Sequence, residues 1–322
     1  MPHIHPEKPL VPCHSFHHIS NMNEATLRHA AELFQVDGES LKPIGGWDAA
    51  VYLASCNGED YVLRFVRSGV VNYRFRQAWG FAELASCHGI RTPVPLPSVD
   101  GKIFEQVDDE HICMKLPYTA GRKLWFLQDE WETLIPLWGR TMARLHRLAE
   151  DFEHIGSWQD EHTSLGRMCP DDRVLRKWNA LGEFLDSLPL EDYGMMHNDM
   201  HQMNIVVTQI ALLDWDVAGP HFFGLDIAIP IYAILNGWFR SKRLGKTNFA
   251  LSFYRNFMSG YREVRDISQD MLELIPVFLK YRQMLQFIVS SGHEMSRREE
   301  LDQRRTLHRI LDNTPLTTLD MW

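Results

Sequence analysis

Residues 194–216 read GMMHNDMHQMNIVVTQIALLDWD, and this stretch decides the fold and the chemistry that we expect of the chain. A polar loop, in which Asp199 and Asn204 stand five residues apart, precedes two short runs of aliphatic residues. The second run leads into Asp214 and Asp216. Because strands joined by a short turn lie antiparallel, the pattern predicts a hairpin that brings two acidic groups and one amide to the same end.

This set of side chains suits phosphoryl transfer. One carboxylate has to orient the attacking hydroxyl and accept its proton, and oxygen ligands have to hold a magnesium ion against nucleotide phosphates. We assign Asp199 to the first task and Asn204 and Asp214 to the second, because Mg²⁺ prefers oxygen ligands. A single Asp or Asn in a loop more often forms a turn, so the hypothesis depends on the combined spacing.

The flanking sequence predicts an α+β protein with two lobes. Residues 1–22, rich in His and Pro, are expected to form an irregular tail. Residues 23–115 predict a small N-terminal antiparallel sheet lobe with one main helix, and residues 116–322 predict a larger, mostly helical lobe. Within the first lobe the pattern predicts strands at 40–44, 50–55 and 61–66, two more strands within 102–115, and helices at 23–34 and 73–88. Asn57-Gly58 predicts a type I′ turn between two of these strands.

The loop from His197 to Asn204 resembles the catalytic loop of the aminoglycoside phosphotransferase and choline kinase superfamily, His-Gly-Asp-x-His-x-x-Asn. Asp214-Trp215-Asp216 resembles the metal motif of that family, and Phe223–Ala228 resembles the start of its next helix. The resemblance covers about residues 41–228 and implies a two-lobed protein-kinase-like fold with the site between the lobes. It also implies that His197 and Asp226 brace the loop through hydrogen bonds.

Carried over to this sequence, the resemblance implies a role for each polar residue of the motif. Asp199 would be the base, and Asn204 and Asp214 the ligands of Mg²⁺. His201, two residues beyond the base, would contact the transferred phosphate, since kinases often have a cation there. Asp216 would contact the metal or a cationic group of the substrate.

The N-terminal lobe carries the residues that we expect to bind ATP. Gly45 and Gly46 lie between two strands, where backbone N–H groups would approach the phosphates, although a plain hairpin turn is the alternative. Arg64 stands where a kinase fold has its phosphate-holding Lys, and a guanidinium can bond two phosphate oxygens. Residues 114–118 end the last strand of this lobe, where kinase folds bind adenine through backbone groups, and Met114 and Leu116 are expected there. Pro117 has no N–H, so Lys115, Leu116 or Tyr118 would supply the donor.

Two features depart from the family pattern. Asn198 replaces the glycine of the catalytic loop. The helix at 73–88 has no evident Glu to pair with Arg64, which leaves two alternatives: a neutral hydrogen bond from Gln77, or an ion pair with Glu83.

Composition excludes several classes of function. The 322 residues contain 33 Lys and Arg against 42 Asp and Glu, a net charge of -9, and no basic run, so nucleic acid is not an expected partner. The five cysteines form no C-x-x-C pair, which favours a reducing compartment and a cytoplasmic location. No apolar segment approaches the ~20 residues of a membrane span, so no membrane partner is expected. A monomer and a homodimer remain alternatives.

We expect the phosphate acceptor to be a hydroxyl of a small molecule. Only residues 215–225 lie between Asp214 and the helix at Asp226, too few for the long segment with which protein kinases hold a peptide. The acidic net charge favours a cationic acceptor such as an amino alcohol, an amino sugar or an amino acid. The alternatives are a protein Ser/Thr kinase of the same fold and a catalytically weak regulator that binds nucleotide or another ligand.

Overall fold

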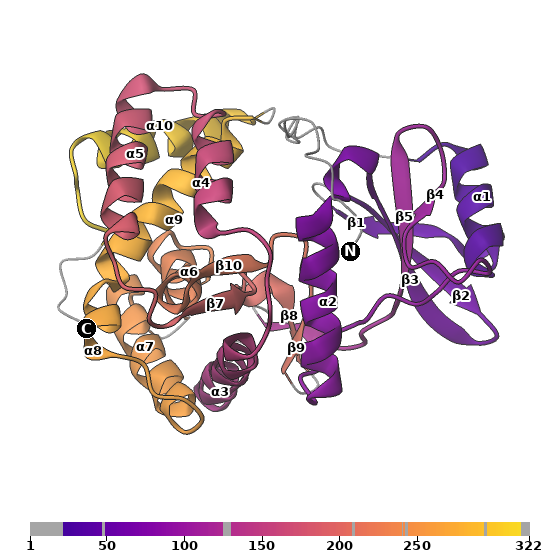
Figure 1. Ribbon diagram of the computed structural model, residues 1–322, viewed down its shortest axis with the longest axis horizontal. Coiled ribbons are helices and arrows are strands. Elements are labelled where there is room, and N and C mark those ends of the chain that lie inside the picture. The colour runs from indigo at the N-terminus through magenta and orange to yellow at the C-terminus, as the bar shows by residue number, and fades with distance from the viewer. Residues whose placement is uncertain are drawn as a thin grey trace, which may run out of the picture.

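The computed structural model describes residues 22–46, 49–124, 130–207, 210–239, 241, 244–292 and 295–316. The predicted tail lies outside these ranges except for Met22, which is buried. Figure 1 shows a sheet-bearing part, built from the N-terminal portion of the chain, beside a larger helical part. This arrangement confirms the predicted α+β architecture with a small antiparallel sheet and a helical C-terminal portion.

The sheet-bearing part contains a five-stranded antiparallel sheet in the order β1-β2-β3-β5-β4. Asn57 and Gly58, between β2 and β3, have φ angles of 52° and 82°, as the predicted type I′ turn requires. The predicted pair of strands within 102–115 is present, but the first is very short and the second extends to Pro117. The elements are α1 (Glu24–Phe34), β1 (Lys42–Gly45), β2 (Ala50–Cys56), β3 (Glu59–Arg67), α2 (Tyr73–Cys87), β4 (Glu105–Gln106) and β5 (His111–Pro117).

Helices α1 and α2 cover opposite faces of this sheet. Alternate residues of a strand point to opposite faces, and in β3 Leu63 and Phe65 join the apolar core beneath α1, whereas Val66 joins the core beneath α2. Asn23 caps α1 as predicted, because its side-chain oxygen accepts a hydrogen bond from the Thr26 N–H at 2.8 Å.

Helices make up most of the chain beyond residue 130. Two pairs of short strands interrupt them, and these strands carry the motif from which the sequence analysis began. The helices are α3 (Trp131–Glu150), α4 (Trp158–Gly166), α5 (Asp172–Asp186), α6 (Phe223–Leu235), α7 (Lys246–Arg262), α8 (Gln269–Glu273), α9 (Ile275–Ser290) and α10 (Arg297–Leu311). These strands are β7 (Tyr193–Met196), β8 (Ile205–Val207), β9 (Ile210–Leu212) and β10 (Gly219–Phe222), and a further short strand before residue 130, β6 (Arg122–Lys123), pairs with β8.

Two glycines let α3 and α7 pack in close contact. A Cβ atom on Gly139 of α3 would lie 2.0 Å from the Phe257 carbonyl oxygen, and one on Gly260 of α7 would lie 1.9 Å from the Pro136 carbonyl oxygen. Any side chain at either position would push the two backbones apart. This contact fixes one side of the helical core, whose centre is α6.

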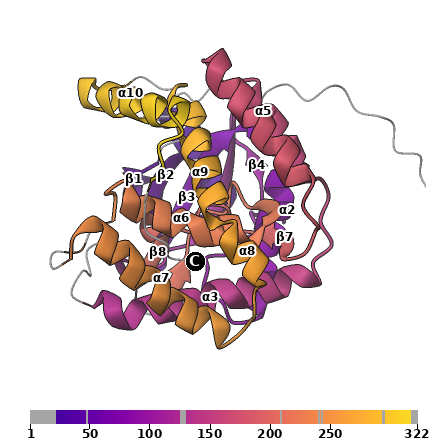
Figure 2. The same cartoon turned by 90° about the vertical axis from the view of Figure 1, so that its left-hand side faces the viewer.

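Helix α6 is buried along its entire length. In Figure 2, which looks onto the helical part, α6 lies near the centre and α5 and α10 lie at the edge. A helix that is apolar on all sides is stable in water when other elements surround it. Among the helices of the described ranges, none combines the length and the apolar character that crossing a membrane requires.

The first turns of α2 are attached to the helical part by polar side chains. Arg74 forms an ion pair with Asp160 at 2.9 Å and donates to the Ser157 carbonyl at 3.0 Å. The Gln77 amide donates to the Ile155 carbonyl at 3.3 Å and accepts from the Ile155 N–H at 2.5 Å. These contacts couple the position of α2 to the connection between α3 and α4.

Two buried histidines, His162 of α4 and His221 of β10, form no ion pair within the described ranges. His162 is stacked on Trp178, with ring centroids 4.2 Å apart, and neither of its ring nitrogens has a hydrogen-bond partner in the described part of the chain. Burial lowers the pKa of His162 to about 4. Burial, helped by the neighbouring His162, lowers the pKa of His221 to about 3. Both imidazoles are therefore neutral in the folded protein at moderate pH.

We predict that this pair makes the fold sensitive to acid. Below pH 6.5 the unfolded chain protonates a histidine that the folded protein keeps neutral, so stability falls as the pH drops toward 4. Each such histidine lowers the free energy of unfolding by roughly 1.4 kcal/mol per pH unit in that window. His162→Phe, which keeps a stacked ring, should reduce the difference in urea midpoint between pH 7 and pH 5. The same change at the exposed His308 should leave the difference unaltered, and an unaltered difference in both variants would refute the assignment.

Candidate active site

A buried carboxylate at the start of α6 holds the catalytic-loop motif in place. Asp226 is fully buried and accepts hydrogen bonds from the backbone N–H groups of His197, at 3.3 Å, and Asn198, at 3.0 Å. His146 of α3 also contacts Asp226, with its Nε2 3.3 Å from the carboxylate. The bracing role predicted for Asp226 is confirmed by these contacts.

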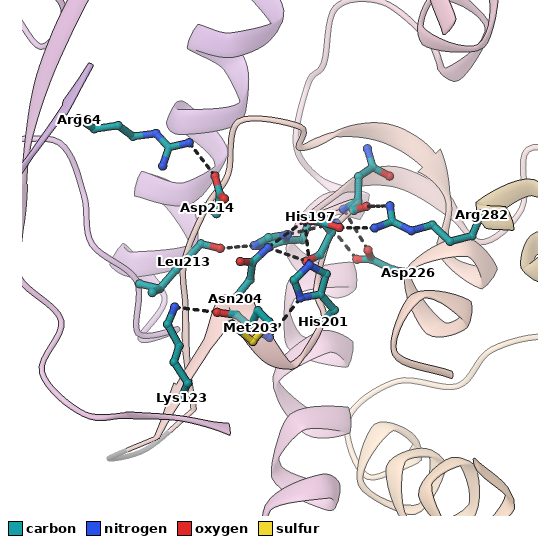
Figure 3. Close-up of polar contacts among 12 residues, drawn as sticks. Arg64, Lys123, His197, His201, Met203, Asn204, Leu213, Asp214, Asp226 and Arg282 are labelled. Carbon is teal, nitrogen blue, oxygen red and sulfur yellow. Dashed lines mark hydrogen bonds and ion pairs between the residues drawn. The ribbon is translucent and has the colours of Figure 1, made fainter. Parts of the chain in front are cut away.

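His197 joins the loop to the end of the β8–β9 hairpin. Its Nε2 lies 3.0 Å from the Leu213 carbonyl oxygen, and the Asp199 N–H lies 3.3 Å from its Nδ1. A neutral ring that donates from Nε2 and accepts at Nδ1 satisfies both contacts. Figure 3 shows His197 between Leu213 and the loop, so its predicted bracing role is also confirmed.

The backbone at Asn198 explains why the family pattern has a glycine there. Asn198 has a φ of 62°, in the left-handed region where Gly is favoured and Asn is tolerated. Its side-chain amide donates to the carbonyls of Val217, at 3.1 Å, and Gly219, at 3.2 Å. The replacement therefore keeps the loop geometry and adds a link to the segment that leads into β10.

The carboxylate of Asp199 lies among three groups that donate hydrogen bonds or carry positive charge. Its Oδ2 accepts from Asn204 Nδ2 at 2.9 Å and lies 3.3 Å from His201 Nε2. Its Oδ1 accepts from Arg282 Nη2 at 2.5 Å. Burial alone would raise the pKa of Asp199, but the charges of His201 and Arg282 outweigh burial and hold that pKa well below its usual range. Asp199 is therefore an anion at any working pH.

The sequence analysis did not predict the contribution of Arg282. This side chain is 8% exposed, lies on α9, and also approaches the Asn198 carbonyl at 3.4 Å. The sequence signal is an arginine within the largely apolar segment 275–288, because a buried guanidinium needs an anionic or carbonyl partner. That signal does not identify the acceptor of Arg282, which is Asp199, 83 residues earlier in the chain.

Hairpin β8–β9 places Asn204 and Asp214 at the same end. The Leu213 N–H donates to the Asn204 carbonyl at 2.9 Å, and Figure 3 shows the Asn204 side chain between Asp214 and His201. Asn204 Nδ2 is used by Asp199, which leaves its Oδ1 for a cation. In the described ranges no group of three or more His, Cys, Asp or Glu side chains could hold a metal. Two oxygen donors fit Mg²⁺, which commonly takes its other ligands from phosphates and water.

Arg64 bridges the two acidic residues of the Asp-Trp-Asp motif. Its Nη2 lies 2.9 Å from Asp214 Oδ1 and also contacts Asp216 Oδ2. Trp79 of α2 donates to the other oxygen of Asp216 at 3.2 Å. Burial raises the pKa of Asp216, Arg64 opposes that rise, and the negative charge of Asp214 adds to it.

These contacts answer the question of what pairs with Arg64. Gln77 is used in the attachment to Ile155, and Glu83 lies on the exposed side of α2. The carboxylates of Asp214 and Asp216 form the ion pairs with Arg64 instead. Neither alternative from the sequence analysis included them, because both acids lie about 150 residues farther along the chain.

The residues expected to bind nucleotide occupy the sheet. Gly45 and Gly46 have φ angles of 144° and 123°, and a Cβ on Gly46 would lie 1.8 Å from the Ala49 carbonyl oxygen, so this turn requires glycine. Residues 47 and 48 of the same turn lie outside the described ranges. Met114 is buried opposite Arg64 in the β3–β5 register, and Leu116 follows on the same face.

His201 begins the short turn that leads to Asn204. Its Nδ1 accepts from the Met203 N–H at 3.1 Å, while its Nε2 faces Asp199. Lys123 of β6 lies on the other side of the loop and donates to the Met203 carbonyl at 2.7 Å. Figure 3 shows both side chains beside the catalytic-loop motif.

A family model described as "Phosphotransferase enzyme family" matches residues 40–265, which contain the loop, the hairpin and the sheet. The chain belongs to this family. Membership in the phosphotransferase enzyme family confirms the resemblance that the sequence motif predicted. The protein is an enzyme, a phosphotransferase with an alcohol group as acceptor.

Relatives of this member of the phosphotransferase enzyme family include small-molecule kinases. It is 27% identical over 324 residues to the amicoumacin kinase of Bacillus subtilis (strain 168), covering 92% of this chain and 94% of that protein. The solved amicoumacin kinase hAmiN has a TM-score of 0.82 at 24% identity, over 92% of this chain and 95% of the other. A microcompartment-associated aminopropanol kinase has a TM-score of 0.70 at 18% identity, over 91% and 99%. These structures confirm the two-lobed kinase-like fold.

We predict that Arg64 contributes to the stability of the fold through its ion pairs in the site. Arg64→Gln would leave the buried Asp216 without its cation, so the free energy of unfolding should fall by about 3 kcal/mol in urea denaturation at pH 7. Arg64→Lys keeps the positive charge, so its free energy of unfolding should fall by less. Equal stability of the glutamine variant and the wild type would contradict the assigned ion pair.

Proposed function

We propose that the protein transfers the γ-phosphate of ATP to a hydroxyl of a small molecule, with Asp199 as the group that receives the hydroxyl proton. The observation that carries the proposal is the surroundings of Asp199. Its carboxylate is kept ionised by Arg282 and His201 and is bonded to Asn204, one of the two oxygen donors at the end of the β8–β9 hairpin. Phosphoryl transfer needs this combination of an oriented carboxylate and an adjacent cation site.

A carboxylate with a depressed pKa acts mainly by orientation. Asp199 would accept a hydrogen bond from the acceptor hydroxyl, align its oxygen for in-line attack, and take the proton late in the transfer. His201 would lie beside the transferred phosphate and stabilise its negative charge. Asn204 and Asp214 would hold Mg²⁺, which when bound neutralises charge on the phosphates.

The nucleotide would lie between the sheet and the hairpin. Arg64 would exchange part of its contact with Asp214 and Asp216 for phosphate oxygens, since a guanidinium can bond both kinds of acceptor. Gly45 and Gly46 would offer backbone N–H groups to the phosphates, and Met114 and Leu116 would flank the adenine. The solved hAmiN kinase is in complex with AMP-PNP and Ca²⁺, which supports nucleotide and divalent-metal use in this fold.

We propose an amino alcohol, an amino sugar or an amino acid as the acceptor class. The relatives named above are kinases of amicoumacin and of aminopropanol, which supports a small molecule with a hydroxyl. The short segment after Asp214 argues against a peptide, because Gly219–Phe222 is already paired with β7 and α6 begins at Phe223. A protein Ser/Thr kinase would need a longer substrate-holding segment here.

Replacing Asp199 tests the proposed base. Asp199→Asn removes the charge while keeping the size of the side chain, so kcat for phosphoryl transfer should fall about 100- to 10,000-fold with little change in the KM for ATP. ATP turnover would be measured against amino alcohols, aminoglycosides, amino acids and unphosphorylated protein. Asp270→Asn, at an exposed position of α8, is the matched control. Undiminished transfer in Asp199→Asn would exclude this role.

Replacing Arg282 tests how Asp199 is kept ionised. Arg282→Gln removes the nearest cation, so the pKa of Asp199 should rise and the acid limb of the kcat/KM profile should move to higher pH. Arg282→Lys should restore much of the wild-type profile, because it returns the charge. A purely structural role would lower the urea midpoint without moving the acid limb, and that result would contradict the prediction.

A further inference from the structure

A large groove lies between the end of α6, α9 and α10. Its volume is about 650 Å³, within the range that holds a drug-sized ligand, whereas the cavity between α2 and α4 holds about 170 Å³. The walls of the groove include Tyr232 of α6, Gln286 and Ser290 of α9, and Arg298 and Arg309 of α10. None of these residues has a role in the site described above.

Two residues that line the groove, Gln286 and Trp238, connect its inner end to the catalytic loop. Gln286 lies one helical turn after Arg282 on α9, and Arg282 is bonded to Asp199. On the opposite wall, Trp238 lines the groove and its carbonyl oxygen accepts from Gln202 of the catalytic loop at 3.4 Å. A molecule that extends inward from the groove, past Gln286 and Trp238, would therefore approach Asp199.

Tyr232 connects this inner end to α10. Burial raises the pKa of Tyr232 to about 12, and the positive charges of Arg282 and Arg309 both oppose the rise. The Tyr232 hydroxyl is therefore affected by the charge of Arg282, which is bonded to Asp199, and by the charge of Arg309 on α10. Tyr232 and Arg309 both line the groove.

The α10 wall of the groove carries more positive than negative charge. Arg298 and Arg309 are exposed and have no carboxylate partner among the residues that the structure describes. The wall also carries two carboxylates, Glu299 in the capping box of α10 and Asp302 paired with Arg305 at 3.1 Å, but with Lys246 of α7 the groove has four cationic side chains against these two. A positive groove is notable on a chain whose net charge is -9, because it is unlike the surface as a whole.

We propose that this groove binds the phosphate acceptor and that Arg298 and Arg309 bind a carboxylate or another anionic group of that acceptor. The inference rests on the proposed function and narrows its acceptor class to molecules that carry an anion as well as a hydroxyl. The hydroxyl would lie at Asp199, and the anion would lie against α10. A guanidinium forms paired hydrogen bonds with a carboxylate, and such charge-assisted bonds are stronger than neutral ones.

Matched free acids and amides test the anion. Threonine and threonine amide form a small pair, and N-acetyl-seryl-leucine and its C-terminal amide form a larger one. Initial rates with ATP and Mg²⁺, and dissociation constants by calorimetry with ADP and Mg²⁺ present, would be measured for each. The acid should be preferred by about 10-fold or more in kcat/KM or in affinity, the size of one charge-assisted contact.

Variants of α10 assign the preference to the groove. In the Arg298→Gln, Arg309→Gln double variant the preference for the acid should disappear through a rise in the acceptor KM, with kcat and the KM for ATP unchanged. Arg304→Gln, on the same helix but outside the groove wall, is the control and should keep the preference.

The outcomes separate the two proposals. Turnover of amides as good as that of acids would overturn the anion site and leave the proposed kinase function standing. Binding of acids that depends on the α10 arginines, without phosphoryl transfer, would support the site and contradict the function. Absence of any preference in both rates and affinities would overturn the inference.

Discussion

The buried carboxylate of Asp226 is the constraint on which the rest of the site depends. It accepts hydrogen bonds from two consecutive backbone N–H groups at the entrance of the catalytic loop, and it is fully enclosed between α3, α6 and that loop. An anion in such a place is stable only while those donors stay in position. The loop is thereby tied to α6, which is buried along its entire length.

Two arginines from distant parts of the chain complete the site. Arg64 reaches from the small sheet to the acids after the β8–β9 hairpin, and Arg282 reaches from α9 to Asp199. Each places positive charge beside a carboxylate that is largely withdrawn from water. The same interactions therefore stabilise the fold, join its sheet-bearing and helical parts, and affect the ionisation of Asp199 and Asp216.

The distribution of charge around Asp199 also bears on the acceptor. The net charge of the chain favours a cationic acceptor, but the groove beside the catalytic loop has arginines on its outer wall and Arg282 near its inner end. A ligand responds to the local field within a few ångströms rather than to the total charge, because water and salt screen distant charges. An acceptor with both an amine and an anion is compatible with both observations.

The sequence by itself determined the elements whose signals are local. The hairpin turn at Asn57-Gly58, the cap at Asn23, the β8–β9 hairpin and the spacing of Asp199, Asn204 and Asp214 all follow from backbone preferences and short-range pattern. The tertiary structure alone decided the partners: Asp214 and Asp216 for Arg64, Arg282 for Asp199, and the groove against α10. Those contacts join residues far apart in sequence, and a buried charge shows that a partner must exist without showing which one the packing will bring to it.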